Sequence, residues 1–180
     1  MKLIVGLGNP GKEYEKTRHN VGFMALNALR EALEKYEVSS WELSKKFNAV
    51  ISGCSVRGEK IILTKPMTYM NASGEAVQLI GQYYKVIPND IIVIHDDKDL
   101  PLGTVRMQVD RGHAGHNGVR SIIELIGTQA FTRFRIGIAV EKPATKKETA
   151  DFVLSKFGLL ERKKVQEAIR KTVHGVLEFL

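Results

Sequence analysis

The chain has 180 residues, of which 27 are Lys or Arg and 20 are Asp or Glu, so its net charge at pH 7 is +7. This length fits a single domain with a full hydrophobic core. The one cysteine, Cys54, excludes an internal disulfide and fits a reducing cytoplasm. No stretch has the length of a signal peptide or of a membrane span, so we expect a cytoplasmic protein. The basic excess favours a polyanionic partner, although an inert basic surface would give the same charge.

Strand and helix patterns alternate along most of the chain. The predicted strands are 2–7, 48–56, 60–64, 91–94, 104–109 and 134–140, and the predicted helices are 21–35, 71 or 73 to 84, 119–126, 148–153 and 159 to the end. The central strand pair, joined by a tight turn at 57–59, implies a mixed sheet. We therefore predict an α/β fold, with one domain over residues 1–180 and a central mixed β-sheet flanked by helices on both faces.

The first predicted strand leads into a turn that carries a polar side chain. Asn9 lies in this turn, and His19 precedes the first predicted helix. Both are therefore expected near the end of a core strand, where α/β proteins place their chemistry. Capping a turn or packing at the helix start is the alternative role for each. The run 6–11 matches the dinucleotide fingerprint formally, but Pro10 removes one backbone donor and the helix begins only near Val21, so we reject that site.

A second polar group follows the four branched apolar residues 91–94. Asp96 can accept a hydrogen bond from an imidazole there and so raise its basicity, although a turn or cap role is the alternative. Asp97 and Asp99 are expected to be solvated turn residues. His95 to Asp99 and His113 to His116 invite a metal interpretation, but this spacing is not the helical pair of zinc proteases, so no metal site is predicted.

Seven short segments, taken together, resemble the bacterial-type peptidyl-tRNA hydrolases. Each segment is weak evidence alone, but their order and spacing across most of the chain make the resemblance specific. They are VGLGNPG at 5–11, TRHNVG at 17–22, KP at 65–66, YMNASG at 69–74, HD at 95–96, DLPLG at 99–103 and GHNG at 115–118.

The resemblance implies an enzyme that cleaves the ester between a peptide and the 3′ end of tRNA, without a metal or another cofactor, and as a monomer. On the family's pattern, His19 is the catalytic base and Asp96 its partner. The other implied site residues are Asn9 in catalysis, Tyr14, Met70, Asn71, His116 and Asn117 at the substrate, and Arg106, Arg133, Arg135 and Lys146 at the tRNA phosphates.

The implied chemistry is coherent with these residue types. A ribose ester has a good leaving group, so one base and a water molecule suffice, and His19 can take the proton. Asn9 or Asn117 can donate to the developing oxyanion, and Asn71 suits a peptide backbone. Capping of a helix is the alternative for Asn117. The sequence alone leaves open which asparagine has which role.

Some positions depart from the family's pattern, and two other functions compete with the implied one. Arg111 replaces a common glycine, Gln108 replaces a residue that is often basic, and the link at 139–143 contains less glycine. The polar segment 141–153 is the predicted mobile lid. An RNA-binding module without activity is opposed by the intact His19 and Asp96. A metal-dependent hydrolase would be excluded by activity that survives a chelator.

Overall fold

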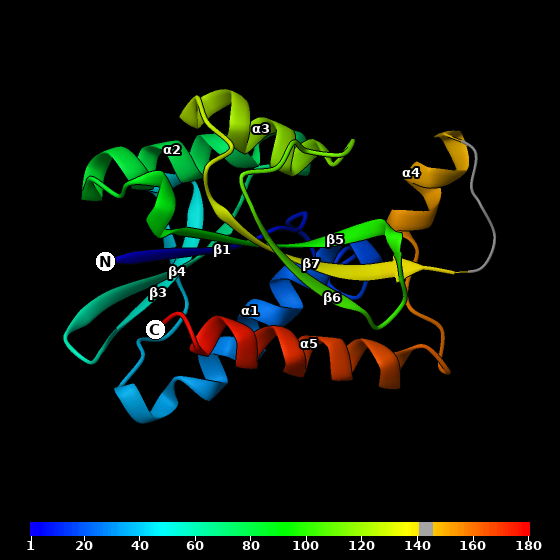
Figure 1. Cartoon of the computed structure of the whole chain (residues 1–180), viewed down its shortest axis with the longest axis horizontal. Coiled ribbons are helices and arrows are strands. Elements are labelled where there is room, and N and C mark those ends of the chain that lie inside the picture. The colour runs from blue at the N-terminus through cyan, green and yellow to red at the C-terminus, as the bar shows by residue number, and fades with distance from the viewer. Residues whose placement is uncertain (141–145) are drawn as a thin grey trace.

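A seven-stranded mixed sheet forms the centre of the molecule, in the order β2-β3-β4-β1-β5-β7-β6 (Figure 1). The computed structural model describes residues 1–140 and 146–180, without the side chains of 146–149. The central strands β4, β1, β5 and β7 are parallel, and β2, β3 and β6 pair antiparallel with their neighbours. The strands are β1 (Lys2–Gly6), β2 (Glu42–Ser44), β3 (Ala49–Val56), β4 (Glu59–Pro66), β5 (Ile91–Pro101), β6 (Val105–Val109) and β7 (Thr132–Ala139).

Helices cover both faces of this sheet, so the predicted fold class is confirmed (Figure 1). α1 and α5 pack on one face, and α2 and α3 pack on the other. α4 lies beyond the carboxyl ends of β5 and β7. The helices are α1 (Val21–Ala32), α2 (Ser73–Tyr84), α3 (Asn117–Ile126), α4 (Lys146–Leu154) and α5 (Arg162–Leu177), with short 3-10 turns that include η1 (Arg18–Asn20) and η4 (Met70–Ala72).

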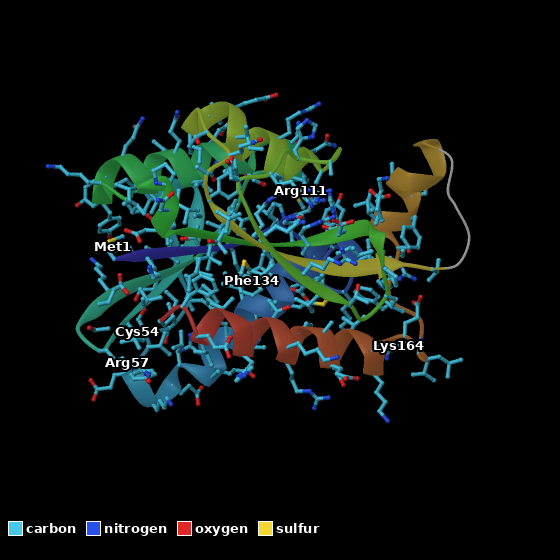
Figure 2. All side chains as sticks on the ribbon, viewed as in Figure 1. Met1, Cys54, Arg57, Arg111, Phe134 and Lys164 are labelled. Atoms are coloured by element: carbon cyan, nitrogen blue, oxygen red, sulfur yellow. The ribbon has the colours of Figure 1, made fainter. Side chains whose placement is uncertain are left out.

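The alternation of side chains along β1 explains the two hydrophobic cores. Leu3 and Val5 point into the core under α2 and α3, whereas Ile4 points into the core shared with α1 and α5. Phe134 of β7 also belongs to the second of these cores and faces α5 (Figure 2). A parallel strand covered on both faces has to be apolar at every position, which accounts for the short continuous apolar run that opens the chain.

Several element boundaries differ from the predicted ones. β2 was not predicted, because this edge strand of three residues has no buried side chain and hence no apolar pattern. β5 continues to Pro101 through a polar run, with an irregular register between Asp97 and Pro101. Pro66 pairs with Ala49 as the last residue of β4, although it was expected to lie outside the ladder.

The predicted lid at 141–153 falls partly outside the described residues, which exclude 141–145 and the side chains of 146–149. Its remaining backbone forms α4, in agreement with the helix predicted near residues 148–153. Its mobility stays a prediction. Among the described residues, none of the helices has the length and apolar character needed to cross a membrane.

Candidate active site

The candidate site lies at the carboxyl ends of β1 and β5, where the order of the parallel strands reverses. Ligands of open α/β sheets bind in the crevice at such a point. α1 begins directly against both strand ends, because a Cβ on Gly22 would lie only 2.4 Å from the Ile94 carbonyl oxygen and 2.5 Å from that of Leu7. This close approach holds η1, which precedes α1 and carries His19, beside the strand ends.

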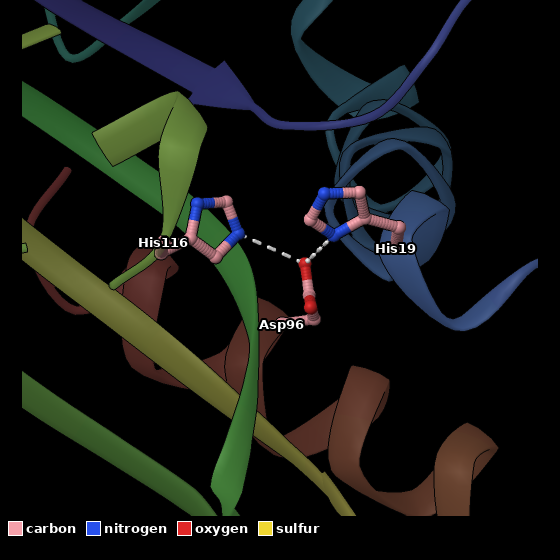
Figure 3. Close-up of side chains that lie close together, drawn as sticks. All are labelled: His19, Asp96 and His116. Carbon is pink, nitrogen blue, oxygen red and sulfur yellow. Dashed lines mark hydrogen bonds and ion pairs between the residues drawn. The ribbon is translucent and has the colours of Figure 1, made fainter. Parts of the chain in front are cut away.

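A buried carboxylate, Asp96, forms the centre of the site (Figure 3). One of its oxygens, Oδ1, lies 2.8 Å from His19 Nδ1 and 3.0 Å from His116 Nε2. Burial alone would raise the pKa of Asp96, but the two imidazoles hold it well below its usual range. The carboxylate is therefore ionised and accepts hydrogen bonds from both rings.

The hydrogen bonds determine which nitrogen of each ring carries the proton. His116 Nδ1 accepts the backbone N–H of Val119 at 3.3 Å, so His116 Nε2 donates to Asp96. His19 Nδ1 donates to Asp96, which leaves Nε2 without a protein partner in the described part of the chain. Burial would lower the pKa of His19, but the charge and hydrogen bond of Asp96 raise it above its ordinary value of 6.5. A neutral His19 therefore offers the lone pair of Nε2 as a base.

A third histidine supports this pair from within the protein. His95 is 2% exposed, and its Nδ1 donates to the backbone oxygen of Asp96 at 2.6 Å. Its ring packs edge-on against His116 with a centroid distance of 4.6 Å. Burial and the neighbouring His116 lower its pKa well below 6.5, so His95 is neutral. From the sequence, His95 was a candidate only as a metal ligand, and its position directly before Asp96 was the available signal for this role.

Hydrogen bonds on both sides orient the amide of Asn9. Asn9 Oδ1 accepts the N–H of Met70 at 2.8 Å, which leaves Nδ2 as a donor without a partner in the described part of the protein. The side chain of Asn20 holds the Asn9 backbone through two bonds of 2.9 Å, one to its N–H and one to its carbonyl oxygen. This role of Asn20 was not predicted, since nothing in the local sequence indicated that its side chain would hold a turn eleven residues earlier.

These groups open onto a cleft with a volume of about 770 Å³. Asn71 and Asn117 are exposed in it, and their side-chain amides have no partner among the described residues. Neither caps a helix, because Ala72 precedes α2 and the His116 side chain caps α3. The predicted substrate residues that line the cleft are Tyr14, Met70, Asn71, His116 and Asn117, together with the predicted catalytic residues His19, Asp96 and Asn9.

Two of the predicted tRNA contacts are buried in the cleft wall. Arg135 forms an ion pair with Asp97 at 2.6 Å and also bonds to Gln108. Arg133 donates to the carbonyl oxygens of Arg111 and Gly112 at 2.8 and 3.0 Å. Both guanidinium groups therefore already have internal partners. The expectation that Asp97 is a solvated turn residue was wrong, because it is 7% exposed and paired.

The other basic residues differ in their placement. Arg106 is exposed on β6 and makes no side-chain hydrogen bond within the described chain. Arg111 and Arg120 are exposed at the cleft. The side chain of Lys146 lies outside the described residues.

One set of side chains has the composition of a metal site. The candidate ligand atoms of His19, Asp96 and His116 lie within 4.8 Å of one another, and two imidazoles with one carboxylate are ligands that zinc accepts. Their mutual hydrogen bonds already account for this closeness. Of the two clusters considered from the sequence, around His95–Asp99 and His113–His116, the structure brings only Asp96 and His116 into this set among the described residues.

An imidazole oriented by a buried carboxylate, beside the central strands of an α/β sheet, is an arrangement that suits general acid–base chemistry. The sequence model of the family described as peptidyl-tRNA hydrolase matches residues 3–180. The chain is 48% identical to "Peptidyl-tRNA hydrolase" of Sorangium cellulosum, over 99% of this chain and 78% of the relative. It is 49% identical to the protein of that name from Aquifex aeolicus, over 98% of this chain and 88% of the relative.

The fold comparison agrees with these relatives. The crystal structure of peptidyl-tRNA hydrolase from Acinetobacter baumannii matches with a TM-score of 0.88 and 37% identity, over 97% of this chain and 85% of that one. The chain therefore belongs to the peptidyl-tRNA hydrolase family and is a hydrolase of that family.

Proposed function

We propose that this enzyme cleaves the ester between the peptide and the terminal ribose of peptidyl-tRNA, with His19 as general base and a water molecule as nucleophile. The family membership supports the reaction. The observation that carries the mechanism is the 2.8 Å bond between His19 Nδ1 and Asp96, because it leaves Nε2 as the basic nitrogen at the cleft. Free tRNA and the released peptide are the products.

The proposed reaction begins with proton transfer from water to Nε2 of His19. The water oxygen then forms a bond to the ester carbon, and Asp96 stabilises the imidazolium that results. When the tetrahedral intermediate collapses, the bond to the ribose oxygen breaks. His19 returns the proton to that oxygen, which leaves as a hydroxyl.

The oxyanion of the intermediate needs a donor that is already in place. Asn9 suits this role, because the Met70 N–H occupies its amide oxygen and none of the described residues bonds its amide nitrogen. One such donor contributes about 3–4 kcal/mol to transition-state stabilisation in other hydrolases. Asn71 and Asn117 then remain to hold the peptide backbone, since their exposed amides offer both a donor and an acceptor.

Phosphate contacts from exposed arginines would bind the tRNA. We assign the first contacts to Arg106, Arg111 and Arg120, because these guanidinium groups are exposed on β6, on the loop after it and on α3. Arg133 and Arg135 line the same cleft but already have internal partners, so we propose that they mainly shape the binding surface. These contacts should depend on salt and be largely independent of base sequence.

Release of an N-acylated amino acid from tRNA, with a chelator present, tests this proposal. Wild type should cleave, and His19→Ala should lose at least about 100-fold in rate while it still binds tRNA. His174→Ala is the matched control, because His174 is 80% exposed on α5. Binding without cleavage by wild type would instead favour an inactive RNA-binding module. Activity lost in chelator and restored by added metal would favour a metal-dependent hydrolase.

A further inference from the structure

The residue that precedes the proposed base, Arg18, is bound to a distant part of the chain. Its backbone N–H donates to the carbonyl oxygen of Ser155 at 2.9 Å, and Thr17 forms an antiparallel bridge with Lys156. Ser155 directly follows α4. The backbone on the amino-terminal side of His19 is therefore hydrogen-bonded to the carboxyl end of α4, more than 130 positions later in the chain.

The side chain of Arg18 extends this connection as far as α5. Its Nε donates to Ser155 Oγ at 3.1 Å, and one terminal nitrogen lies 3.0 and 2.7 Å from the two carboxylate oxygens of Glu161. The guanidinium also lies over two aromatic rings, 4.5 Å from the centroid of Phe152 and 5.0 Å from that of Phe157. We call these contacts of Arg18 with Phe152, Ser155, Phe157 and Glu161 the Arg18 clamp.

The clamp holds a helix that forms one wall of the cleft. Ala150, Val153 and Leu154 of α4 line the cleft, whereas Phe152 of the same helix lies against Arg18. The clamp therefore joins the backbone that carries His19 to this helix of the cleft wall. Neither Arg18 nor Glu161 lines the cleft, so neither is placed to touch a substrate there.

The ion pair of Arg18 and Glu161 is expected to contribute little to the stability of the fold. Arg18 is 6% exposed, and one of its terminal nitrogens, NH1, is buried without a hydrogen-bond partner among the described residues. A buried ion pair contributes little compared with well-packed apolar residues of the same volume, and an unused buried donor is a further cost. Burial would raise the pKa of Glu161, but the bonds from Arg18 and from the Gly158 N–H lower it, so Glu161 is ionised at neutral pH.

We propose that Arg18 is a positioning residue of this hydrolase, whose clamp on Ser155 and Glu161 fixes the distance between the α4 wall of the cleft and the imidazole of His19. The inference rests on the proposed function, because it assigns the α4 wall to the binding of peptidyl-tRNA. When the clamp opens, α4 shifts, the substrate binds less tightly and the His19–Asp96 bond stays intact.

Glu161→Gln tests the clamp without a change inside the cleft, since glutamine keeps the shape and the bond to the Gly158 N–H but loses the charge. Glu167→Gln is the matched control on α5, because Glu167 forms an exposed pair with Lys171. We expect Glu161→Gln to raise KM for N-acyl-aminoacyl-tRNA about tenfold with kcat within about twofold of wild type. The amide of Ser155 should also exchange with solvent faster in this variant.

Arg18→Lys provides a second test, because lysine keeps the charge but cannot bond Ser155 from one nitrogen and Glu161 from another, or stack in the same way. Its KM should rise at least as much as that of Glu161→Gln, and the double variant should cost no more than Arg18→Lys alone. A lower melting temperature with KM and exchange unchanged in both variants would show a purely structural pair and overturn the proposal.

Failure of the proposed function would be distinguishable from failure of the clamp. If wild type itself does not cleave the substrate, the proposed function fails. Hydrogen exchange then tests the clamp by itself. If the Ser155 amide exchanges equally slowly in Glu161→Gln and Glu167→Gln, the proposed clamp is contradicted.

Discussion

Two consecutive aspartates of β5 show how differently the same residue type can act. Asp96 and Asp97 are both buried, at 2% and 7% exposure. Asp96 accepts hydrogen bonds from two imidazoles, whereas Asp97 forms an ion pair with the guanidinium of Arg135. An imidazole can gain and lose a proton near neutral pH, and a guanidinium cannot. The partner, and not the carboxylate, therefore separates the proposed role of Asp96, which is to orient a base, from the support that Asp97 gives to the cleft wall.

The geometry of the strand produces this division. Successive side chains of a strand point to opposite sides, so neighbouring aspartates meet different elements. Asp96 meets η1 and the loop before α3, which carry His19 and His116. Asp97 meets Arg135 of β7 and also accepts the N–H of Asp99 at 2.9 Å, which supports the turn after it.

Replacement of Asp96 should have the largest effect on the reaction. In Asp96→Asn, the shape is kept but the imidazolium of His19 loses its counter-charge and the ring its orienting acceptor. We expect kcat to fall by about 100- to 10,000-fold, as in other hydrolases with an oriented histidine. Single-turnover cleavage of N-acyl-aminoacyl-tRNA would measure this. A loss below about threefold would mean that Asp96 does not support the base.

Replacement of Asp97 should affect stability more than chemistry. Asp97→Asn leaves the charge of Arg135 buried without its counter-ion, so we expect the free energy of unfolding to fall by about 3 kcal/mol. The folded enzyme should lose less than about tenfold in kcat, since His19 and Asp96 keep their bond. Urea denaturation together with turnover would test both statements. A loss of activity equal to that of Asp96→Asn, with stability unchanged, would remove the distinction between the two aspartates.

Replacement of single arginines should have the smallest effects, and these effects should differ between exposed and buried arginines. Arg106→Ala should weaken tRNA binding and reduce the slope of log affinity against log salt by about 1, because it removes one phosphate contact. Arg133→Ala should instead destabilise the fold, since this guanidinium holds the carbonyl oxygens of Arg111 and Gly112. Binding titrations at several salt concentrations would measure the slopes. An unchanged slope for Arg106→Ala would make Arg106 a bystander.

Local sequence signals predicted the fold class and the main groups of the site. Asp96 follows the buried apolar run 91–94 of β5, and His19 precedes an amphipathic helix, so their location near the site could be predicted from spacing alone. The partner of Asp97 could not be predicted from spacing, because its ion pair with Arg135 depends on which strand lies beside β5. The same holds for Arg18, whose partner Glu161 is 143 positions away, and for Asn20, whose bonds to the backbone of Asn9 are not indicated by the motif at 17–22. Long-range pairing, rather than local pattern, decided these contacts.

The pH dependence of kcat/KM tests the central claim most directly, which is that His19 acts as a base oriented by Asp96. Only neutral His19 can accept a proton, so kcat/KM should rise with pH and level off above a midpoint higher than the ordinary 6.5 of histidine. In Asp96→Asn the midpoint should move to lower pH, because the carboxylate that raises the pKa of His19 is gone. A profile that is flat between about pH 5 and 8, or a midpoint that Asp96→Asn leaves unchanged, would contradict the account.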